Sequence, residues 1–367
     1  MGLTIHSSRS LFAARLNSGV RAHIMIAVLH VRLPFELLVP EVAQYTLRTY
    51  EDAGYSVQIG VPGRSDAPNR GDVPDSVLIN DEKSFQADVL TITFGRESFN
   101  RELSTEIDPP YSVINRAIAS FLGRLKYVSK APQIHAVELP ESAWRLSYLN
   151  DDGSELEMQE GLKRVHGAAV FGFSWIACDP ALWEIIHALP PDFSPPEWRT
   201  LLTDAAGALP HVGTAIVLTA TSLEVFIAEL LNGLQTRSSL PNSAWFWMND
   251  RANRQNNPTV EEQYSVLLSI LCGRSLKEES ALWQGFMNLK TARNKFVHTG
   301  AASVGGARVT TSQAREYVAL AETITATIRD WIPNEMRWPV FEHQVSIQIV
   351  KILSQPQEHQ EGSAGAP

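Results

Sequence analysis

Three polar side chains close together in the sequence have the chemistry needed to cleave RNA. Arg293 is followed directly by Asn294, and His298 lies five positions after the arginine. A guanidinium binds phosphate through paired hydrogen bonds and stays protonated, so it can stabilise a phosphorane. An imidazole can accept the proton of a 2′-hydroxyl and donate one to a departing 5′-oxygen. We therefore assign His298 as the acid/base, Arg293 as the phosphate clamp, and Asn294 as an auxiliary that holds the phosphate or orients the imidazole.

Other charged residues could support this group. Lys290 and Lys295 lie on the same segment, and residues 285–298 contain no acid. These two lysines are weaker candidates for RNA binding. Glu224, in a distant apolar segment, could pair with Arg293 and orient it; a plain surface glutamate is the alternative.

The candidate residues lie at the end of a predicted amphipathic helix, residues 276–300. Ser275 and Glu278 match a capping box at its start, and Gly300 is a natural left-handed stop. The apolar residues that share one face are Leu282, Phe286, Leu289 and Phe296.

Helical geometry limits how Arg293 and His298 can act together. Residues five apart point about 140° away from each other on a regular helix, so the two do not share a face. Either the last turn loosens, or the long arginine side chain swings round. The alternative without catalysis is that both cations cap the helix C-terminus, where the helix dipole favours positive charge.

The spacing of Arg293 and His298 resembles the R-x4–6-H motif of the HEPN (higher eukaryotes and prokaryotes nucleotide-binding) domains. The resemblance covers residues 196–333 and extends no further towards the N-terminus. It implies a metal-independent endoribonuclease whose products are a 2′,3′-cyclic phosphate and a 5′-hydroxyl. It also implies a prokaryotic antiviral, abortive-infection or toxin role. Active members of the family pair as dimers, so one protomer's histidine could act with the arginine of the other.

Two other functions remain open. The helical part could be a non-catalytic HEPN-like module for dimerisation or nucleotide binding in an interaction protein. Alternatively, the main chemistry could belong to the N-terminal half, with a ligand that the sequence does not reveal. In the nuclease hypothesis, residues 22–190 would be a sensor or regulatory domain that responds to a protein or ligand trigger.

The first half of the chain is predicted to be an α+β domain with a mixed or antiparallel sheet and a long helix. Helices are expected at residues 40–53 and 111–128. Strands are expected at residues 22–33, 56–61, 76–79, 87–94, 134–138, 144–149 and 164–176. A stretch with prolines at 190–191 and 195–196 marks the domain boundary.

The second domain, residues 196–335, is predicted to be an all-α antiparallel helical bundle, and the resemblance implies that it forms a homodimer. Helices are expected at residues 197–208, 211–234, 260–272, 276–300 and 312–332, with a loop at 235–258. Short connections between helices favour antiparallel neighbours. We expect a loose extension at residues 1–21, a strand or short helix within a C-terminal extension at 336–353, and a disordered tail at 354–367.

Composition narrows the class of protein. Hydrophobic residues make up 44% of the 367-residue chain, which is typical of a globular protein. Because the net charge is −9, any RNA must bind a local basic patch. The two cysteines suggest a reducing, cytoplasmic setting. We find no apolar run long enough to cross a bilayer and expect no membrane partner. The histidines lack the spacing of zinc ligands, so no metal and no cofactor are expected.

Overall fold

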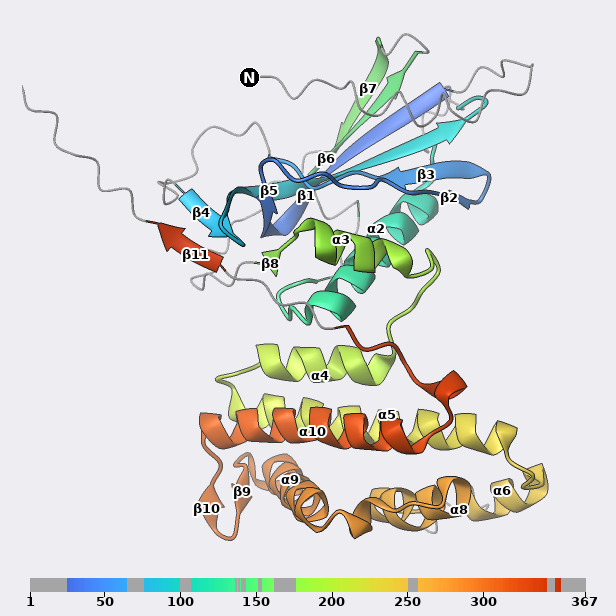
Figure 1. Ribbon diagram of the computed structural model, residues 1–367, viewed down its shortest axis with the longest axis vertical. Coiled ribbons are helices and arrows are strands. Elements are labelled where there is room, and N and C mark those ends of the chain that lie inside the picture. The colour runs from blue at the N-terminus through green and yellow to red at the C-terminus, as the bar shows by residue number, and fades with distance from the viewer. Residues whose placement is uncertain are drawn as a thin grey trace, which may run out of the picture. The chain divides into compact units, whose positions relative to one another are not determined.

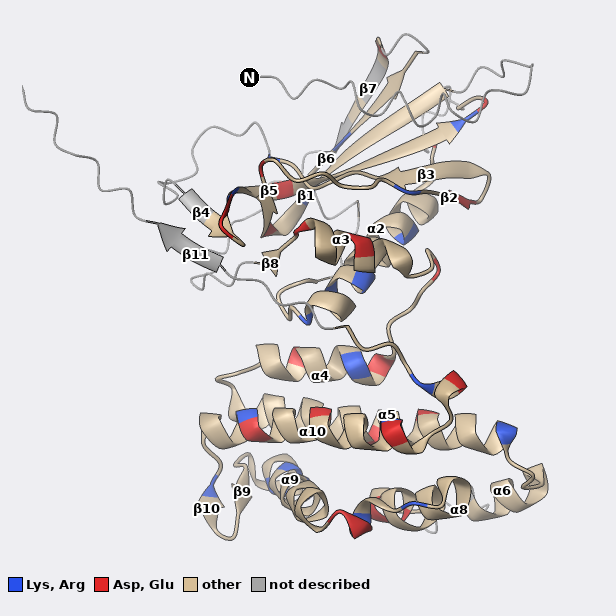
Figure 2. Cartoon of the chain, in the orientation of Figure 1, with Lys and Arg blue, Asp and Glu red and all other residues tan. Residues whose placement is uncertain are grey.

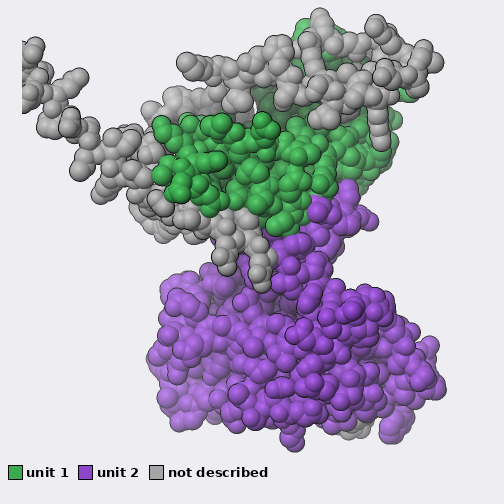
Figure 3. Space-filling model, viewed as in Figure 1, with its two compact units in different colours: residues 1–121, 137–187, 344–367 green, residues 122–136, 188–343 purple. Residues whose placement is uncertain are grey.

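The chain is a mixed α+β protein that divides into two compact units. The computed structural model describes residues 25–64, 76–99, 107–135, 137, 139, 143–150, 154–161, 176–249, 257–341 and 347–350. One unit comprises Met1–Phe121, Val137–His187 and Gln344–Pro367, and the other Leu122–Ala136 and Ala188–His343 (Figure 3). We call them the sheet unit and the helical unit. The expected α+β class, with an antiparallel sheet N-terminally and helices C-terminally, is confirmed.

The sheet unit contains a nine-stranded sheet among its described residues. Its strands are β1 (Met25–Pro40), β2 (Thr49–Asp52), β3 (Tyr55–Ile59), β4 (Ser76–Ile79), β5 (Glu82–Arg96), β6 (Trp144–Leu149), β7 (Glu155–Gly161), β8 (Ile176–Ala177) and β11 (Ile347–Val350). The main path runs β11-β4-β5-β1-β6-β7, and β3 pairs with both β2 and β5. These pairs are antiparallel, whereas the short strand β8 runs parallel to β1.

Helix α3 (Pro180–Ala188) and the part of helix α2 (Tyr111–Ser129) up to Phe121 lie along one face of the sheet (Figure 1). Alternate residues of β1, namely Ala27, Leu29 and Val31, are fully buried, as expected for a strand with one covered face. Phe121 of α2 packs on Trp183 of α3, with ring centroids 5.9 Å apart. The apolar core of the sheet unit therefore sits between the sheet and these helices.

The helix predicted at residues 40–53 is wrong. The described chain there is irregular until β2, which forms a hairpin with β3. Ala53 and Gly54 make the turn with φ of 50° and 80°, and positive φ at both central residues is what a tight two-residue hairpin requires. Helix α3 and strand β7 were not predicted. The described residues of the predicted strand 134–138 are not extended in the sheet, and most of the strand predicted at 164–176 lies outside the described residues.

Strand β11 decides between the two structures considered for the C-terminal extension. It pairs antiparallel with β4, with Ile347 opposite Ile79, so this part of the extension is a strand. Before it, Asn334–Met336 forms a 3₁₀ turn in the helical unit. The proposed loose extension at 1–21 and tail at 354–367 lie outside the described residues.

The helical unit is built around one long helix. Its helices are α4 (Glu197–Gly207), α5 (Val212–Arg237), α6 (Asn242–Asn249), α7 (Val260–Glu262), the π-helical turn η2 (Gln263–Leu267), α8 (Leu268–Cys272), the 3₁₀ turn η3 (Leu276–Glu278), α9 (Ser280–Thr299) and α10 (Thr311–Trp331). Helix α5 contacts α4, α8, α9 and α10. Its buried side chains include Leu223, Phe226 and Ile227, and they form the middle of a single apolar cluster.

Helix α5 corrects the expectation that no apolar run in the chain is long enough to cross a bilayer. By length and composition alone, it is the one helix among the described residues that could cross a membrane. Of its most apolar stretch, 56% is buried inside the protein. That burial is explained by its central place in the apolar cluster of the helical unit.

The loop predicted at residues 235–258 contains a helix, α6, in its described part. Its three consecutive aromatic residues have different environments. Trp245 is 7% exposed and joins the core, whereas Phe246 and Trp247 are 65% and 75% exposed. One face of α6 therefore anchors it, and the other two aromatic rings face outwards.

Helix α9 crosses its neighbours instead of running antiparallel to them. In Figure 1, α5 and α10 lie across the view while α9 is seen nearly along its axis. Two glycines allow the close crossing. A Cβ at Gly213 of α5 would lie 1.9 Å from the Phe296 ring, and one at Gly285 of α9 would lie 2.7 Å from Leu320. The short loops therefore did not impose the antiparallel packing expected for α9.

Candidate functional site

The helix that carries the candidate residues begins later than predicted. Ser275 caps only the turn η3, accepting a hydrogen bond from the Lys277 amide at 3.2 Å. Glu279 then breaks the helical path with φ of −90° and ψ of 79° before α9 starts. The predicted end is confirmed, since Gly300 adopts a left-handed φ of 72° and donates to the Phe296 carbonyl at 2.7 Å. The last turn of α9 is thus regular and does not loosen.

Arg293 points from α9 towards α5. Its Nη2 lies 3.9 Å from Oε1 of Glu224, and its Nη1 donates to Oδ1 of Asn294 at 3.2 Å. Its Nε is buried and finds no hydrogen-bond partner among the described residues. Two neighbours therefore orient the guanidinium, while some of its five N–H donors stay unused.

His298 faces outwards at the C-terminal end of α9. Its side chain is exposed and makes no hydrogen bond or ion pair with a described residue. Asn294, one turn earlier, lies on the same side of the helix as His298, yet its amide oxygen is already occupied by Arg293. The structure brings Arg293, Asn294 and Glu224 together and leaves His298 apart from Arg293 within one chain.

The two candidate RNA-binding lysines have different surroundings. Lys290 forms a short ion pair between its Nζ and Oε1 of Glu261, which lies in α7. Lys295 is exposed and forms no ion pair with a described residue. Of these two lysines, Lys295 is therefore the solvent-facing cation without an acidic partner among the described residues.

The motif helix and the segment after it are strongly biased in charge. Residues 280–315 contain no Asp or Glu, although the whole chain has a net charge of −9. The acids that meet α9 come from elsewhere, Glu224 from α5 and Glu261 from α7. Figure 2 shows basic residues on α9 and on strand β10 (Ala307–Arg308) of the hairpin that follows it.

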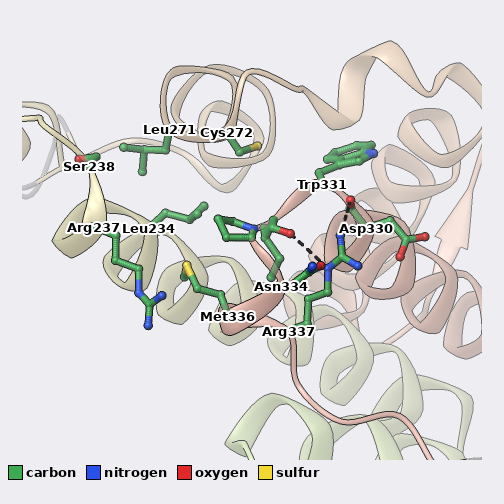
Figure 4. Close-up of a pocket in the computed structure, with 12 residues that line it drawn as sticks. Leu234, Arg237, Ser238, Leu271, Cys272, Asp330, Trp331, Asn334, Met336 and Arg337 are labelled. Atoms are coloured by element: carbon green, nitrogen blue, oxygen red, sulfur yellow. Dashed lines mark hydrogen bonds between the residues drawn. The ribbon is translucent and has the colours of Figure 1, made fainter.

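An open pocket of about 580 Å³ lies elsewhere in the helical unit, where α5, α8 and α10 end (Figure 4). Cys272, Trp331 and Asn334 are among its lining residues, and none of the candidate site residues lines it. Arg337, also on its wall, donates to the carbonyls of Ile332 and Asp330, at 3.2 Å each. This arginine satisfies carbonyls that the end of α10 leaves open, so its charge has a structural explanation.

The sheet unit contains its own polar cluster. Tyr55 forms a short hydrogen bond with Asp108, and Arg96 donates to the Tyr55 hydroxyl at 2.8 Å. Burial, followed by the Asp108 hydrogen bond, raises the pKa of Tyr55 to about 12. The phenol therefore stays protonated at neutral pH, and the cluster connects β3 and β5 to the residues before α2.

No protein-family model, curated protein or solved structure matches the chain. Within the described residues, His, Cys, Asp and Glu side chains form no group of three that could hold a metal ion.

Proposed function

We propose that the helical unit is a HEPN-type, metal-independent endoribonuclease. The observation that carries the proposal is the environment of Arg293, whose guanidinium is oriented by Glu224 and Asn294 and keeps unused donors. An arginine held in this way is suited to binding a phosphate through paired hydrogen bonds. His298, exposed on the last turn of the same helix, is the acid/base.

The reaction needs no cofactor. His298 accepts the proton of a 2′-hydroxyl, and the resulting oxygen attacks the adjacent phosphorus. Arg293 stabilises the added negative charge, with Asn294 as an auxiliary and Lys295 adding positive field. The bond from phosphorus to the 5′-oxygen breaks, and the protonated imidazole returns a proton to that oxygen. The products are a 2′,3′-cyclic phosphate and a 5′-hydroxyl.

The separation of Arg293 from His298 leads us to propose a homodimer through the helical unit. In this arrangement His298 of one protomer acts with the partner's Arg293. Two features of α9 support it: the exposed imidazole, and the neighbouring Val297, whose side chain is 54% exposed. The wider role we propose is cytoplasmic, in prokaryotic antiviral defence, abortive infection or toxicity, with the sheet unit sensing a trigger.

The separation of Arg293 from His298 within one chain also favours a second candidate function. If the two motif residues never meet, the helical unit is a non-catalytic module for dimerisation or nucleotide binding. In that case Arg293 serves only to pair with Glu224 inside the unit, and His298 stabilises the C-terminus of α9 through the helix dipole.

RNA cleavage by the purified full chain in buffer containing EDTA tests the proposal. Wild type should cleave a single-stranded RNA, and His298→Ala should be at least about 100-fold slower, the usual loss when a general acid/base is removed. His135→Ala is the matched control, because His135 is another exposed histidine of the helical unit.

Undiminished cleavage by His298→Ala would disprove the assignment of the acid/base. Cleavage that requires a divalent metal would disprove the metal-independent mechanism. If none of the three proteins cleaves RNA but all form dimers, the non-catalytic module becomes the better description.

A further inference from the structure

We propose that Glu261 is an internal counter-charge for Lys290 and sets how many RNA phosphates the site can hold. The protein at rest then binds RNA with one cation fewer than α9 carries. This inference rests on the proposed RNA-binding function, because it concerns the regulation of the same site. It makes Glu261 a positioning residue that controls a binding cation.

The ion pair between Lys290 and Glu261 is partly open to water. The Lys290 side chain is 36% exposed and that of Glu261 33%. An ion pair that is partly open to water contributes little to stability, so the charge of Glu261 can be removed without unfolding the protein, and Lys290 then becomes available to an RNA phosphate. A carboxylate and a phosphate oxygen offer the ammonium group the same kind of charge-assisted hydrogen bond.

The two acids that meet α9 are held differently. Glu224 lies in the middle of α5, the 26-residue central helix, and its contact with Arg293 is long at 3.9 Å. Glu261 lies in the three-residue helix α7, which the π-helical turn η2 follows directly. π-Helical turns are rare and are often found at functional sites. Glu224 therefore only borders its arginine, whereas Glu261 neutralises its lysine directly.

The capping box next to Glu261 does not use the Glu261 carboxylate. The adjacent capping box is made by Thr259 and Glu262, whose carboxylate accepts from the Thr259 amide at 2.7 Å. Glu261 takes no part in that box, so Glu261→Gln leaves it intact and preserves the side-chain shape. The substitution removes the charge that neutralises Lys290.

The test is the salt dependence of RNA binding. Each additional phosphate neutralised on a single strand makes the slope of log affinity against log salt steeper by about 0.7. Affinity is measured by fluorescence anisotropy with a labelled 2′-O-methyl RNA oligomer, which has no free 2′-hydroxyl and cannot be cleaved. The full-length proteins are wild type, Glu261→Gln, the double variant Glu261→Gln/Lys290→Gln, and the control Glu278→Gln.

Glu278→Gln is a matched control. Glu278 also lies in a first helical turn and pairs with a cation, Arg274, at 3.5 Å, and that cation precedes α9 in the chain. It changes the net charge by the same amount. We expect Glu261→Gln to steepen the slope by about 0.7, equivalent to about 2.5-fold more loss of affinity between 50 and 200 mM salt. The control and the double variant should keep the wild-type slope.

The outcomes separate this inference from the proposed function. An unchanged slope in Glu261→Gln, or a steeper slope that persists in the double variant, overturns the inference alone. Binding with the expected slopes, but without cleavage of unmodified RNA in EDTA, supports the inference and overturns the nuclease. Absence of RNA binding by all four proteins overturns both.

Discussion

Single side chains of the candidate site differ in how firmly their surroundings fix them. Arg293 is held by Glu224 and Asn294 and has a buried Nε. His298 is exposed and lacks a described partner. Removing Arg293 therefore disturbs packing as well as charge, whereas removing His298 leaves the helical unit intact. For this reason His298→Ala is the cleaner probe of chemistry, and Arg293→Ala needs a folding control.

Because the sheet unit contains a buried thiol, we expect the stability of the folded protein to fall at alkaline pH. Burial raises the pKa of Cys178 from its ordinary value of 9.0 to about 12. The folded protein keeps this proton longer than the unfolded chain, so the stabilisation is complete below pH 9 and is lost as pH rises towards 12. Urea unfolding of wild type at pH 8 and pH 10 should show a loss of up to about 1.4 kcal/mol per pH unit from this group.

Cys178→Ala is the control for that measurement, because the variant lacks the titrating group. Its stability should decline less steeply above pH 9 than that of wild type. Tyr55, whose pKa is raised to about 12, remains in both proteins and supplies a common background. Equal declines in the two proteins would contradict the role of the thiol.

At the scale of elements, the crossing of α5 and α9 depends on a glycine. Gly213→Ala places a methyl group against the Phe296 ring, where a Cβ would lie 1.9 Å from the nearest ring atom. Overpacking of this kind destabilises a protein by about 1–3 kcal/mol. We expect a lower midpoint of urea unfolding and, because Phe296 precedes His298 on α9, weaker RNA cleavage.

Gly233→Ala gives a matched comparison within the same helix. A Cβ there meets only the flexible end of Met336, at 3.1 Å, so alanine should be tolerated. Replacing a helix-interior glycine by alanine favours folding by up to about 1 kcal/mol. Destabilisation by both variants alike would show that the Phe296 contact is not the cause.

The elements that the sequence predicted well are those whose start or end is marked by nearby residues, such as a capping box or a helix-ending glycine. The predicted helix 312–332 corresponds to α10, whose start has a capping box made by Thr310 and Gln313. Gly300 ends α9 in the left-handed conformation as predicted, and Gly273 ends α8 in the same conformation. By contrast, local patterns do not reveal the hairpin of β2 and β3 or helix α6. The hairpin pairs with the neighbouring strand β5, and α6 is anchored by the buried Trp245.

The sequence predicted the candidate site only in part, because contacts between segments that are distant in the chain leave no local pattern. The functional residue types on α9 could be identified from the sequence. Their five-residue spacing also predicted that Arg293 and His298 lie on different faces of the helix. Glu261 was missed because it is 29 positions from Lys290, and nothing in the local pattern links a first-turn glutamate to a distant lysine. The contact exists because the folded helical unit brings α7 against α9.

At the scale of the whole molecule, a dimer predicts complementation between inactive variants. Arg293→Ala and His298→Ala should each be inactive alone, since each removes one half of a composite site. After mixing with subunit exchange, a heterodimer contains one site with an intact His298 and the partner's intact Arg293. With random exchange, about a quarter of wild-type activity should return in a two-fold symmetric dimer. RNA cleavage before and after exchange measures it.

The double variant Arg293→Ala/His298→Ala is the control, because mixing it with either single variant cannot create a complete site. Recovery in that mixture would indicate contamination. If the two single variants form mixed dimers, as shown by mass spectrometry, and still remain inactive, the composite site does not exist.

The pairing of β11 with β4 has a consequence for how the protein is made. Strand β4 emerges from the ribosome early, together with β5, its neighbour on one side. Its neighbour on the other side, β11, is translated only after the helical unit. During that interval the nascent sheet has an open edge at β4, which other extended chains can recognise. Cells that make this protein must therefore protect an unfinished sheet until synthesis reaches Ile347–Val350.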